Sequence, residues 1–302
     1  MSGHRDTPQA GIFALGTASH AYLEFDLHPG ADPRELVSRL ADLREPRTTI
    51  GGVNLVVGLR PELWRDLGAA APPDLNGFDT PVIGPDGFTM PATQHDAVLW
   101  LAGAAYDVVF DEARAAIAAL GSVASVADEV SSWPYRHDRD LTGFIDGMEN
   151  PSLALAPDIA LVPSDAPGAG GSVLLLQRWS HDVAAWEALP RETQERTMGR
   201  TKDDSIELQD RPADSHVART DQEDFGDVFR RNTPYGTVTA HGTMFVGFAS
   251  EQGPLARMLA SMAGIGGPRD ALTRYTTPET GAYYFVPSAP ALLAFAHDPD
   301  AG

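Results

Sequence analysis

The chain of 302 residues contains no cysteine. Disulfide bonds, thiolate nucleophiles, zinc–thiolate sites, iron–sulfur clusters and thiolate-ligated metal centres are therefore excluded. A chain without cysteine fits a reducing compartment. The sequence also shows no signal peptide, no twin-arginine leader and no apolar run long enough for a membrane span. We therefore expect a cytoplasmic protein.

Positive charge is scarce. The chain has 22 Lys and Arg residues against 42 Asp and Glu residues, for a formal net charge of −20. Binding to nucleic acid depends on Lys and Arg that neutralise phosphates, and binding to anionic membranes needs basic patches. We therefore expect no nucleic-acid partner and no membrane partner. Small neutral or positively charged molecules remain as partners.

Several catalytic and metal-binding motifs are missing. The nine histidines form no H-E-x-x-H or H-x-H spacing, and the chain has no G-x-S-x-G or Walker-type loop. Four histidines stand in polar or helix-start contexts and are expected to be solvated: His4, His28, His181 and His297. Four others have no partner at a motif spacing and are expected to have no functional role: His20, His95, His137 and His241.

Hydrophobic residues make up 43% of the chain, which is enough for a full core. Apolar patterning predicts strands at 21–27, 53–59, 98–102, 123–129, 172–177, 243–248 and 283–287. Helices are predicted at 32–43, 61–67, 107–120, 182–189, 191–198 and 255–262. Three stretches rich in proline and glycine are predicted to be loops: 69–93, 157–171 and 263–280.

The order of these elements indicates an α+β fold. Each half reads as strand, helix, strand, strand, helix, strand, which predicts two β-α-β-β-α-β units with antiparallel sheets and helices on one face. The division between the halves is expected between residues 130 and 150. A single continuous α+β sheet is the alternative.

Residues 143–151, Gly-Phe-Ile-Asp-Gly-Met-Glu-Asn-Pro, contain the first candidate site residue. Asp146 stands in a G-x-x-D-G pattern, and Gly147 follows it directly. Glycines permit backbone bends and close approach that a Cβ would prevent, so the segment could bring one carboxylate close to a flat or bulky group. Asp-Gly is also a favoured turn pair, and these five residues alone favour a plain turn.

Two later segments add an imidazole and a guanidinium. His216 follows Asp214 and Ser215, which could begin a helix or a turn, and Arg230 precedes Asn232 in an Arg-x-Asn-x-Pro-Tyr-Gly run. Taken alone, His216 could equally be a structural histidine. Arg230 and its neighbour Arg231 could likewise be a solvated pair.

Together, G-x-x-D-G at 143–147, D-S-H-V at 214–217 and R-x-N-x-P-Y-G at 230–236 resemble the dye-decolourising peroxidases, specifically the bacterial B-type group. Matches at 138–151, 199–202 and 287–288 extend the likeness, which covers roughly residues 12–295. The resemblance implies two ferredoxin-like halves, here 1–138 and 139–302, with haem b in the C-terminal half. It also implies a peroxidase that reduces hydrogen peroxide through a ferryl intermediate. Small aromatic reductants such as dyes and phenols would be oxidised in one-electron steps.

By this resemblance, His216 is the proximal ligand of the haem iron. A ligating imidazole usually donates its other N–H to a carboxylate or a carbonyl, and Asp270 is the candidate partner. Gly147 would bring backbone against the haem, and Arg200 could pair with a haem propionate or lie on the surface. Five aromatic residues could relay electrons to bulky donors or simply pack: Trp133, Tyr135, Trp179, Trp186 and Tyr235.

Asp146, Arg230 and Asn232 would lie on the opposite, distal face of the haem. A carboxylate can carry a proton between the peroxide oxygens, and a guanidinium can stabilise the developing negative charge. Asn232 could hold a water or orient Arg230. An aspartate has an ordinary pKa of about 3.9 against about 6.5 for histidine, so we expect an acidic pH optimum.

Members of this family commonly self-associate, so a homo-oligomer is expected. Two alternatives remain at this point. One is a haem-binding or haem-delivering protein with incidental peroxidase activity, and the other is a ferredoxin-like binding module without haem.

Overall fold

The computed structural model describes residues 6–43, 52–136 and 138–297. His4 and His137 lie outside the described residues. The strands are β1 Ser19–Leu27, β2 Val53–Leu59, β3 Val82–Ile83, β4 Thr89–Met90, β5 Ala97–Gly103, β6 Ala124–Ser132, β7 Ser172–His181, β8 Phe229–Arg230, β9 Thr233–Gly236, β10 His241–Ala249, β11 Thr276–Pro278 and β12 Ala282–Val286.

The α-helices are α1 Pro33–Asp42, α2 Pro61–Asp66, α3 Tyr106–Leu120, α4 Ala156–Ala160, α5 Val183–Glu187, α6 Arg191–Met198, α7 His216–Arg219, α8 Gln222–Phe225, α9 Gln252–Met262 and α10 Ala289–Leu293. Two 3₁₀ turns are η1 Ala10–Phe13 and η2 Ala271–Arg274. None of the helices within these described ranges is both long and apolar enough to cross a membrane.

The main sheet is antiparallel and closes on itself. Its strand order is β11-β7-β12-β2-β5-β1-β6-β9-β10-β8, and an additional pairing of β7 with β10 joins the ends into a barrel-like ring. The two halves of the chain meet at two narrow seams, where Phe285 pairs with Leu59 and Ser132 pairs with Tyr235. The predicted antiparallel α+β architecture is therefore confirmed, with the strands of both halves in one continuous sheet.

Closing the ring creates two cores. One face of the strands forms an inner core around Tyr22, Trp100, Phe248 and Tyr284. The other face packs against the helices in an outer core that includes Phe25 of β1. Strand β1 is buried on both faces from Ser19 to Phe25, because one face of the strand fills the ring and helices cover the other.

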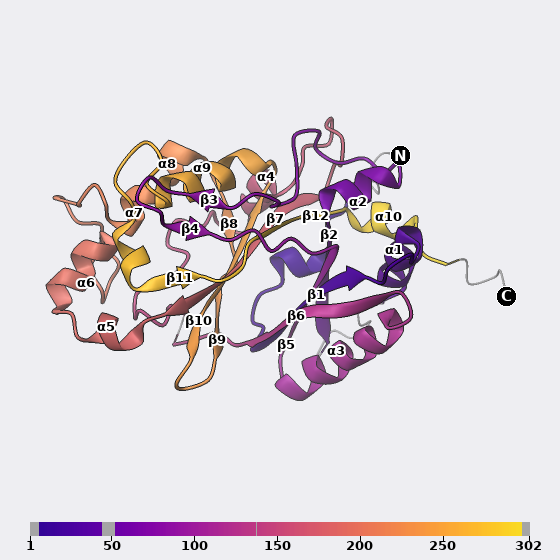
Figure 1. The fold of residues 1–302 in the computed structure, drawn as a ribbon, viewed down its shortest axis with the longest axis horizontal. Helices are drawn as coiled ribbons and strands as arrows, with labels where there is room; N and C mark the ends of the chain where they lie inside the picture. Colours follow the sequence, from indigo (N-terminus) through magenta and orange to yellow (C-terminus); the bar gives the residue numbers. More distant parts are fainter. Residues whose placement is uncertain (1–5, 44–51, 137, 298–302) are drawn as a thin grey trace.

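Figure 1 shows how the helices are distributed. Helices α1, α2, α3 and α10 lie at the end of the molecule near the chain termini, and α5 to α9 lie at the opposite end. The long predicted strands and helices are found within a few residues of their predicted bounds. The three predicted loops are wrong in part, because they contain the β3–β4 hairpin, α4, and η2 with β11.

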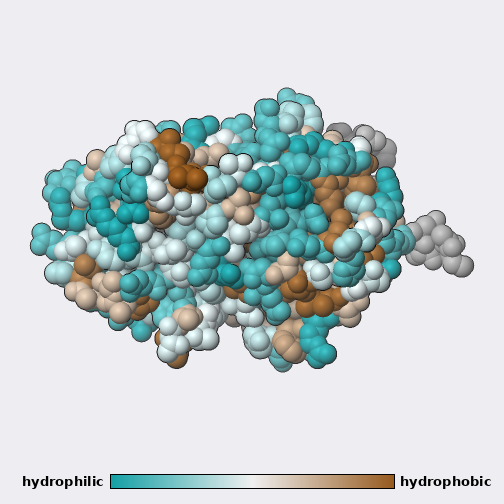
Figure 2. All heavy atoms as spheres, viewed as in Figure 1, coloured by the Kyte–Doolittle hydropathy of each residue, from teal (hydrophilic) through white to brown (hydrophobic). Residues whose placement is uncertain are grey.

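The surface is mostly hydrophilic, as the acidic composition predicts. Figure 2 shows hydrophilic residues over most of one face, with small and separated hydrophobic patches. Isolated apolar side chains of this kind are normal on a folded protein.

Candidate functional site

The candidate site is a cavity at the end of the molecule formed by α5 to α9. It has a volume of about 1200 Å³ when its open mouth is included. Its walls are the loop before α4, the outer face of β7 and β10, and helices α6, α7 and α9. Six of the predicted site residues line it: Asp146, Gly147, Arg200, His216, Arg230 and Asn232. The seventh, Asp270, lies behind His216.

The loop that carries Asp146 depends on glycine. Gly143 and Gly147 have φ values of 89° and 73°, a region in which other residues are strained. A Cβ at Gly143 would also lie 2.6 Å from Cε of Lys202. The backbone N–H of Gly147 donates to Oδ1 of Asp146 at 2.7 Å, which fixes the carboxylate. The segment forms turns and also lines the cavity, while the role of Asp146 stays a prediction.

Arg230 is tied to the same loop through Asn150. The Asn150 side chain donates to the carbonyl oxygen of Arg230 and accepts from its backbone N–H, both at 2.8 Å. Asn232 is held in turn by the backbone N–H of Val246, which donates to its Oδ1 at 3.0 Å. Nε of Arg230 is buried without a hydrogen-bond partner within the described residues. Its guanidinium is therefore available to a ligand.

His216 approaches the cavity from the other side. It begins α7, and the Ser215 side chain caps that helix by accepting from the backbone N–H of Ala218 at 3.4 Å. Nδ1 of His216 lies 2.6 Å from Oδ2 of the fully buried Asp270, and Oδ1 of Asp270 accepts from the backbone N–H of Leu272. The predicted contact between these two residues is therefore present, although their functional roles stay predictions.

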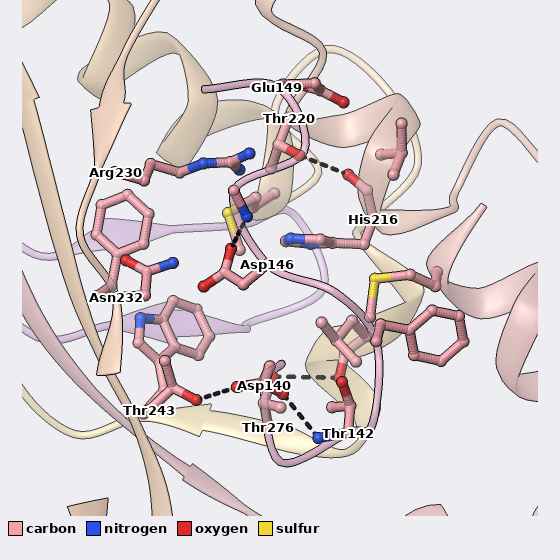
Figure 3. A pocket seen from close by; sticks show the side chains of 18 of the residues that line it. Asp140, Thr142, Asp146, Glu149, His216, Thr220, Arg230, Asn232, Thr243 and Thr276 are labelled. Carbon is pink, nitrogen blue, oxygen red and sulfur yellow. Dashed lines mark hydrogen bonds between the residues drawn. The ribbon is translucent and has the colours of Figure 1, made fainter. Parts of the chain in front are cut away.

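The carboxylate of Asp270 controls the protonation of His216. Burial lowers the pKa of His216, but the negative charge and hydrogen bond of Asp270 outweigh it, and the net pKa lies above the ordinary value. Because Nδ1 is committed to Asp270, Nε2 is the nitrogen left for a ligand. Figure 3 shows the imidazole pointing from α7 toward the side occupied by Asp146.

Arg200 lies at a polar edge of the cavity. Its guanidinium donates to Oε1 of Glu149 at 2.8 Å and to the carbonyl oxygen of Ser205 at 3.1 Å. Oε2 of Glu149 and Oγ of Ser205 are buried without a partner within the described part of the chain. This edge can therefore accept further polar groups, although Glu149 already neutralises Arg200.

A polar cluster that no sequence motif predicts lies at another part of the wall. Oγ1 of Thr243 donates to Asp140 and lies 3.3 Å from Nε2 of His181. Burial raises the pKa of Asp140, but His181 and hydrogen bonds from Thr243 and Thr142 bring it below the ordinary value. The prediction that His181 is solvated is wrong, because the residue lines the cavity and burial lowers its pKa. Only tertiary structure brings these segments together.

The size and lining of the cavity fit a large, mostly apolar cofactor with a polar rim. Apolar side chains form much of the lining: Leu175, Phe245, Leu255, Met258, Leu259, Met262 and Leu272. Several buried polar atoms of the lining have no partner among the described residues: Thr142 Oγ1, Glu149 Oε2, Gln177 Nε2, Ser205 Oγ and Arg230 Nε. No group of three or more His, Asp or Glu residues in the described ranges could hold a metal ion by itself. A metal at this site would therefore be carried by a cofactor, with His216 as the candidate ligand.

The contact between His216 and Asp270 leads to a direct test on the haem-free protein. Replacing Asp270→Asn removes the negative charge and leaves burial as the main influence, so the pKa of His216 should fall below its ordinary value. A pH titration of the His216 ring protons by nuclear magnetic resonance measures this change. Asp214→Asn is the control, because Asp214 is close in sequence but pairs with Arg274. An unchanged pKa in Asp270→Asn would contradict the prediction.

Comparisons with known proteins identify the family of the chain. The family described as Dyp-type peroxidase, C-terminal, matches residues 137–291. A dye-decolorizing peroxidase from Rhodococcus erythropolis is 32% identical over 291 residues, covering 90% of this chain and 84% of the relative. One from Mycobacterium tuberculosis is 33% identical over 292 residues, covering 92% and 85%. A DypB variant from Rhodococcus jostii RHA1, solved in complex with heme, is 32% identical with a TM-score of 0.86, covering 97% of this chain and all of that one. The chain belongs to the Dyp-type peroxidase family.

Proposed function

We propose that this protein is a haem b peroxidase of the B-type group that reduces hydrogen peroxide and oxidises aromatic donors such as dyes and phenols. The observation that carries the proposal is the arrangement of the cavity. His216 enters from one side with Nε2 free, and Asp146, Arg230 and Asn232 line the same cavity. The structure of a relative in complex with heme supports the choice of cofactor.

On the proximal side, His216 would hold the haem iron through Nε2. Asp270 would fix the orientation of the ring through Nδ1 and make the imidazole more strongly donating. Asp270 is itself held by the backbone N–H of Leu272 at 2.8 Å. Bound haem would supply the iron at which the O–O bond of peroxide is cleaved and the oxidising equivalents passed singly to donors.

On the distal side, Asp146 would accept a proton from the inner oxygen of peroxide and return it to the departing oxygen. The hydrogen bond from Gly147 leaves the second carboxylate oxygen available for this transfer. Arg230 would stabilise the negative charge on the departing oxygen, because its Nε is desolvated and unpartnered. Asn232, held by Val246, would orient peroxide or a water against these groups.

A second cavity offers a route for peroxide. It has a volume of about 1130 Å³ including open space, and it shares Asp146, Arg230 and Asn232 with the first cavity. Peroxide could therefore reach the distal residues without crossing the apolar wall. At the polar edge, the Arg200 guanidinium and the unpartnered hydroxyl of Ser205 are the candidate donors to the haem propionates. Gly147 would let the backbone lie against the haem.

The finer description of the fold is also a proposal. Strand orders β6-β1-β5-β2 and β12-β7-β10-β8, both antiparallel, support two ferredoxin-like halves at 1–138 and 139–302, with haem in the second. Cytoplasmic location and self-association stay predictions. The absence of cysteine supports the former.

Haem binding through His216 is tested with purified protein reconstituted with haem. His216→Ala should abolish the Soret band of tightly bound haem, because the imidazole proposed to hold the iron is lost. The control is His95→Ala, which removes another histidine paired with an aspartate, Asp26 at 2.9 Å, outside the cavity. Absorption spectroscopy measures both. A normal Soret band in His216→Ala would refute the proposed ligand.

The distal assignment predicts slower reaction with peroxide. Arg230→Ala should slow the first spectral change of the haem roughly 100- to 1000-fold, as loss of a charge-stabilising donor does elsewhere. Asp146→Ala should slow it at least about 100-fold. Stopped-flow absorption measures these rates, with the exposed residues Arg257→Ala and Asp158→Ala as controls. If both site variants react like the wild type, haem binding or delivery becomes the better account of the cavity.

Turnover should be fastest at acidic pH. A distal carboxylate remains an effective proton acceptor under acidic conditions in which an imidazole would already be protonated. The steady-state rate of dye oxidation against pH measures this, with haem retention checked at each pH by its absorption. An optimum at or above about pH 7 would count against Asp146 as the proton acceptor.

A further inference from the structure

The hydrogen bond of the Trp100 indole differs from those of the other buried tryptophans in the described chain. Nε1 of Trp64 donates to the carbonyl oxygen of Ala70, and Nε1 of Trp186 donates to that of Thr142. Trp179 donates to the side-chain oxygen of Gln177. Trp100 donates to Nδ1 of His20 at 3.1 Å. An imidazole nitrogen can accept a proton at neutral pH, whereas an amide oxygen cannot.

Trp100 and His20 lie inside the ring of strands and are almost fully buried. Their side chains are 1% and 3% exposed. Because Nδ1 of His20 accepts from Trp100, the proton of the neutral ring is on Nε2, which lies 3.2 Å from Oγ1 of Thr17. Thr17 and His20 also line the second cavity, together with Asp146, Arg230 and Asn232. The pair is therefore connected to the proposed peroxide route.

His20 is neutral and available as a proton acceptor. Burial, with a smaller contribution from the charge of Arg231, lowers the pKa of His20 to about 4. The guanidinium of Arg231 also lies 5.1 Å from the centroid of the Trp100 ring, so a positive charge on either ring is disfavoured. A proton that reaches His20 will therefore be passed on toward Thr17 and the cavity.

We propose that Trp100 and His20 form a redox-active pair that stores an oxidising equivalent when no aromatic donor is present. This rests on the proposed function, because the oxidant is hydrogen peroxide acting through the haem. Trp100 loses one electron to the peroxide-oxidised haem, and the proton on its Nε1 moves to Nδ1 of His20. The proton on Nε2 of His20 leaves through Thr17. The products are a neutral Trp100 radical, haem reduced by one electron, and one released proton.

The surroundings favour Trp100 over the neighbouring Tyr22 as the residue that carries the radical. Tyr22 is stacked on Trp100, with ring centroids 5.7 Å apart. Its hydroxyl, however, pairs with the hydroxyl of Thr233 at 2.9 Å, which is not a base. Burial raises the pKa of Tyr22, so the phenol holds its proton. The same interior position shields a Trp100 radical from solvent and keeps it outside the haem cavity.

The test uses haem-loaded protein that contains ring-deuterated tryptophan, frozen after peroxide is added without a donor. Electron paramagnetic resonance should show a tryptophan radical, and peptide mass spectrometry should place the oxidation product at Trp100. Trp100→Phe should lose both signals. His20→Gln keeps a hydrogen-bond acceptor but removes the base, so it should also lose the radical. Trp179→Phe and Trp186→Phe are matched controls and should behave like the wild type.

The outcomes separate this inference from the proposed function. If peroxide leaves the haem spectrum unchanged, both are wrong. If the haem spectrum changes but the radical persists in Trp100→Phe, or the product maps to Trp179, the pair is wrong and the peroxidase proposal stands. Circular dichroism and the Soret band verify folding of each variant. If Trp100→Phe fails to fold, the result for His20→Gln tests the proposed pair, because this variant leaves Trp100 in place.

Discussion

The pairing of β7 with β10 is the constraint on which the rest of the structure depends. It closes the antiparallel ring, and its register places Met244 opposite Arg178 and Val246 opposite Leu176. Alternate residues of both strands therefore fill the ring interior, while the residues between them face the cavity. A Cβ at Gly242 would lie 1.8 Å from the carbonyl oxygen of Trp179, so close pairing at this point requires glycine.

The same pairing positions the site. The backbone N–H of Val246, on β10, holds Asn232, and Arg230 pairs with Gly247 of the same strand. Asn150 then ties the backbone of Arg230 to the loop of Asp146. The three proposed distal residues are therefore fixed to a single rigid frame. His216 and Asp270 belong to segments outside the ring, and Glu149 of the Asp146 loop links the two sides of the cavity by accepting from Arg200 and Gln222.

The two sides of the site differ in the charged groups that they carry. A buried carboxylate, Asp270, raises the pKa of His216 and fixes its orientation. Across the cavity, Arg230 and Asp146 place opposite charges near each other. An acidic protein with net charge −20 thus keeps its buried cations beside carboxylates or at the cavity wall. Inside the ring, by contrast, no such charge pair forms around these two residues. His20 is neutral, and Arg231 donates to backbone carbonyl oxygens instead of to a carboxylate.

The long strands and helices could be predicted because each carries a hydrophobic pattern of sufficient length. In a helix this pattern covers at least about one and a half turns, and in a strand it covers about five residues. Short elements such as α7, with four residues, and β8, with two, carry no such pattern and exist only because other segments pack against them. The motif residues of the site were identified through their resemblance to the dye-decolourising peroxidases, because each motif is a short local run; taken alone, the same residues favoured a plain turn and a solvated arginine pair. Asp140 with His181, and Trp100 with His20, were missed because their partners are distant in sequence.

The sequence by itself determined the α+β class, the order of the main elements and six of the residues that line the cavity. It did so because hydrophobic periodicity and glycine positions act over a few residues. Only the tertiary structure decided that the strands close into one ring, that the candidate partner Asp270 does reach His216, and that His20 stands beside Trp100. These contacts join segments 54 and 80 residues apart. They depend on packing that no local pattern encodes.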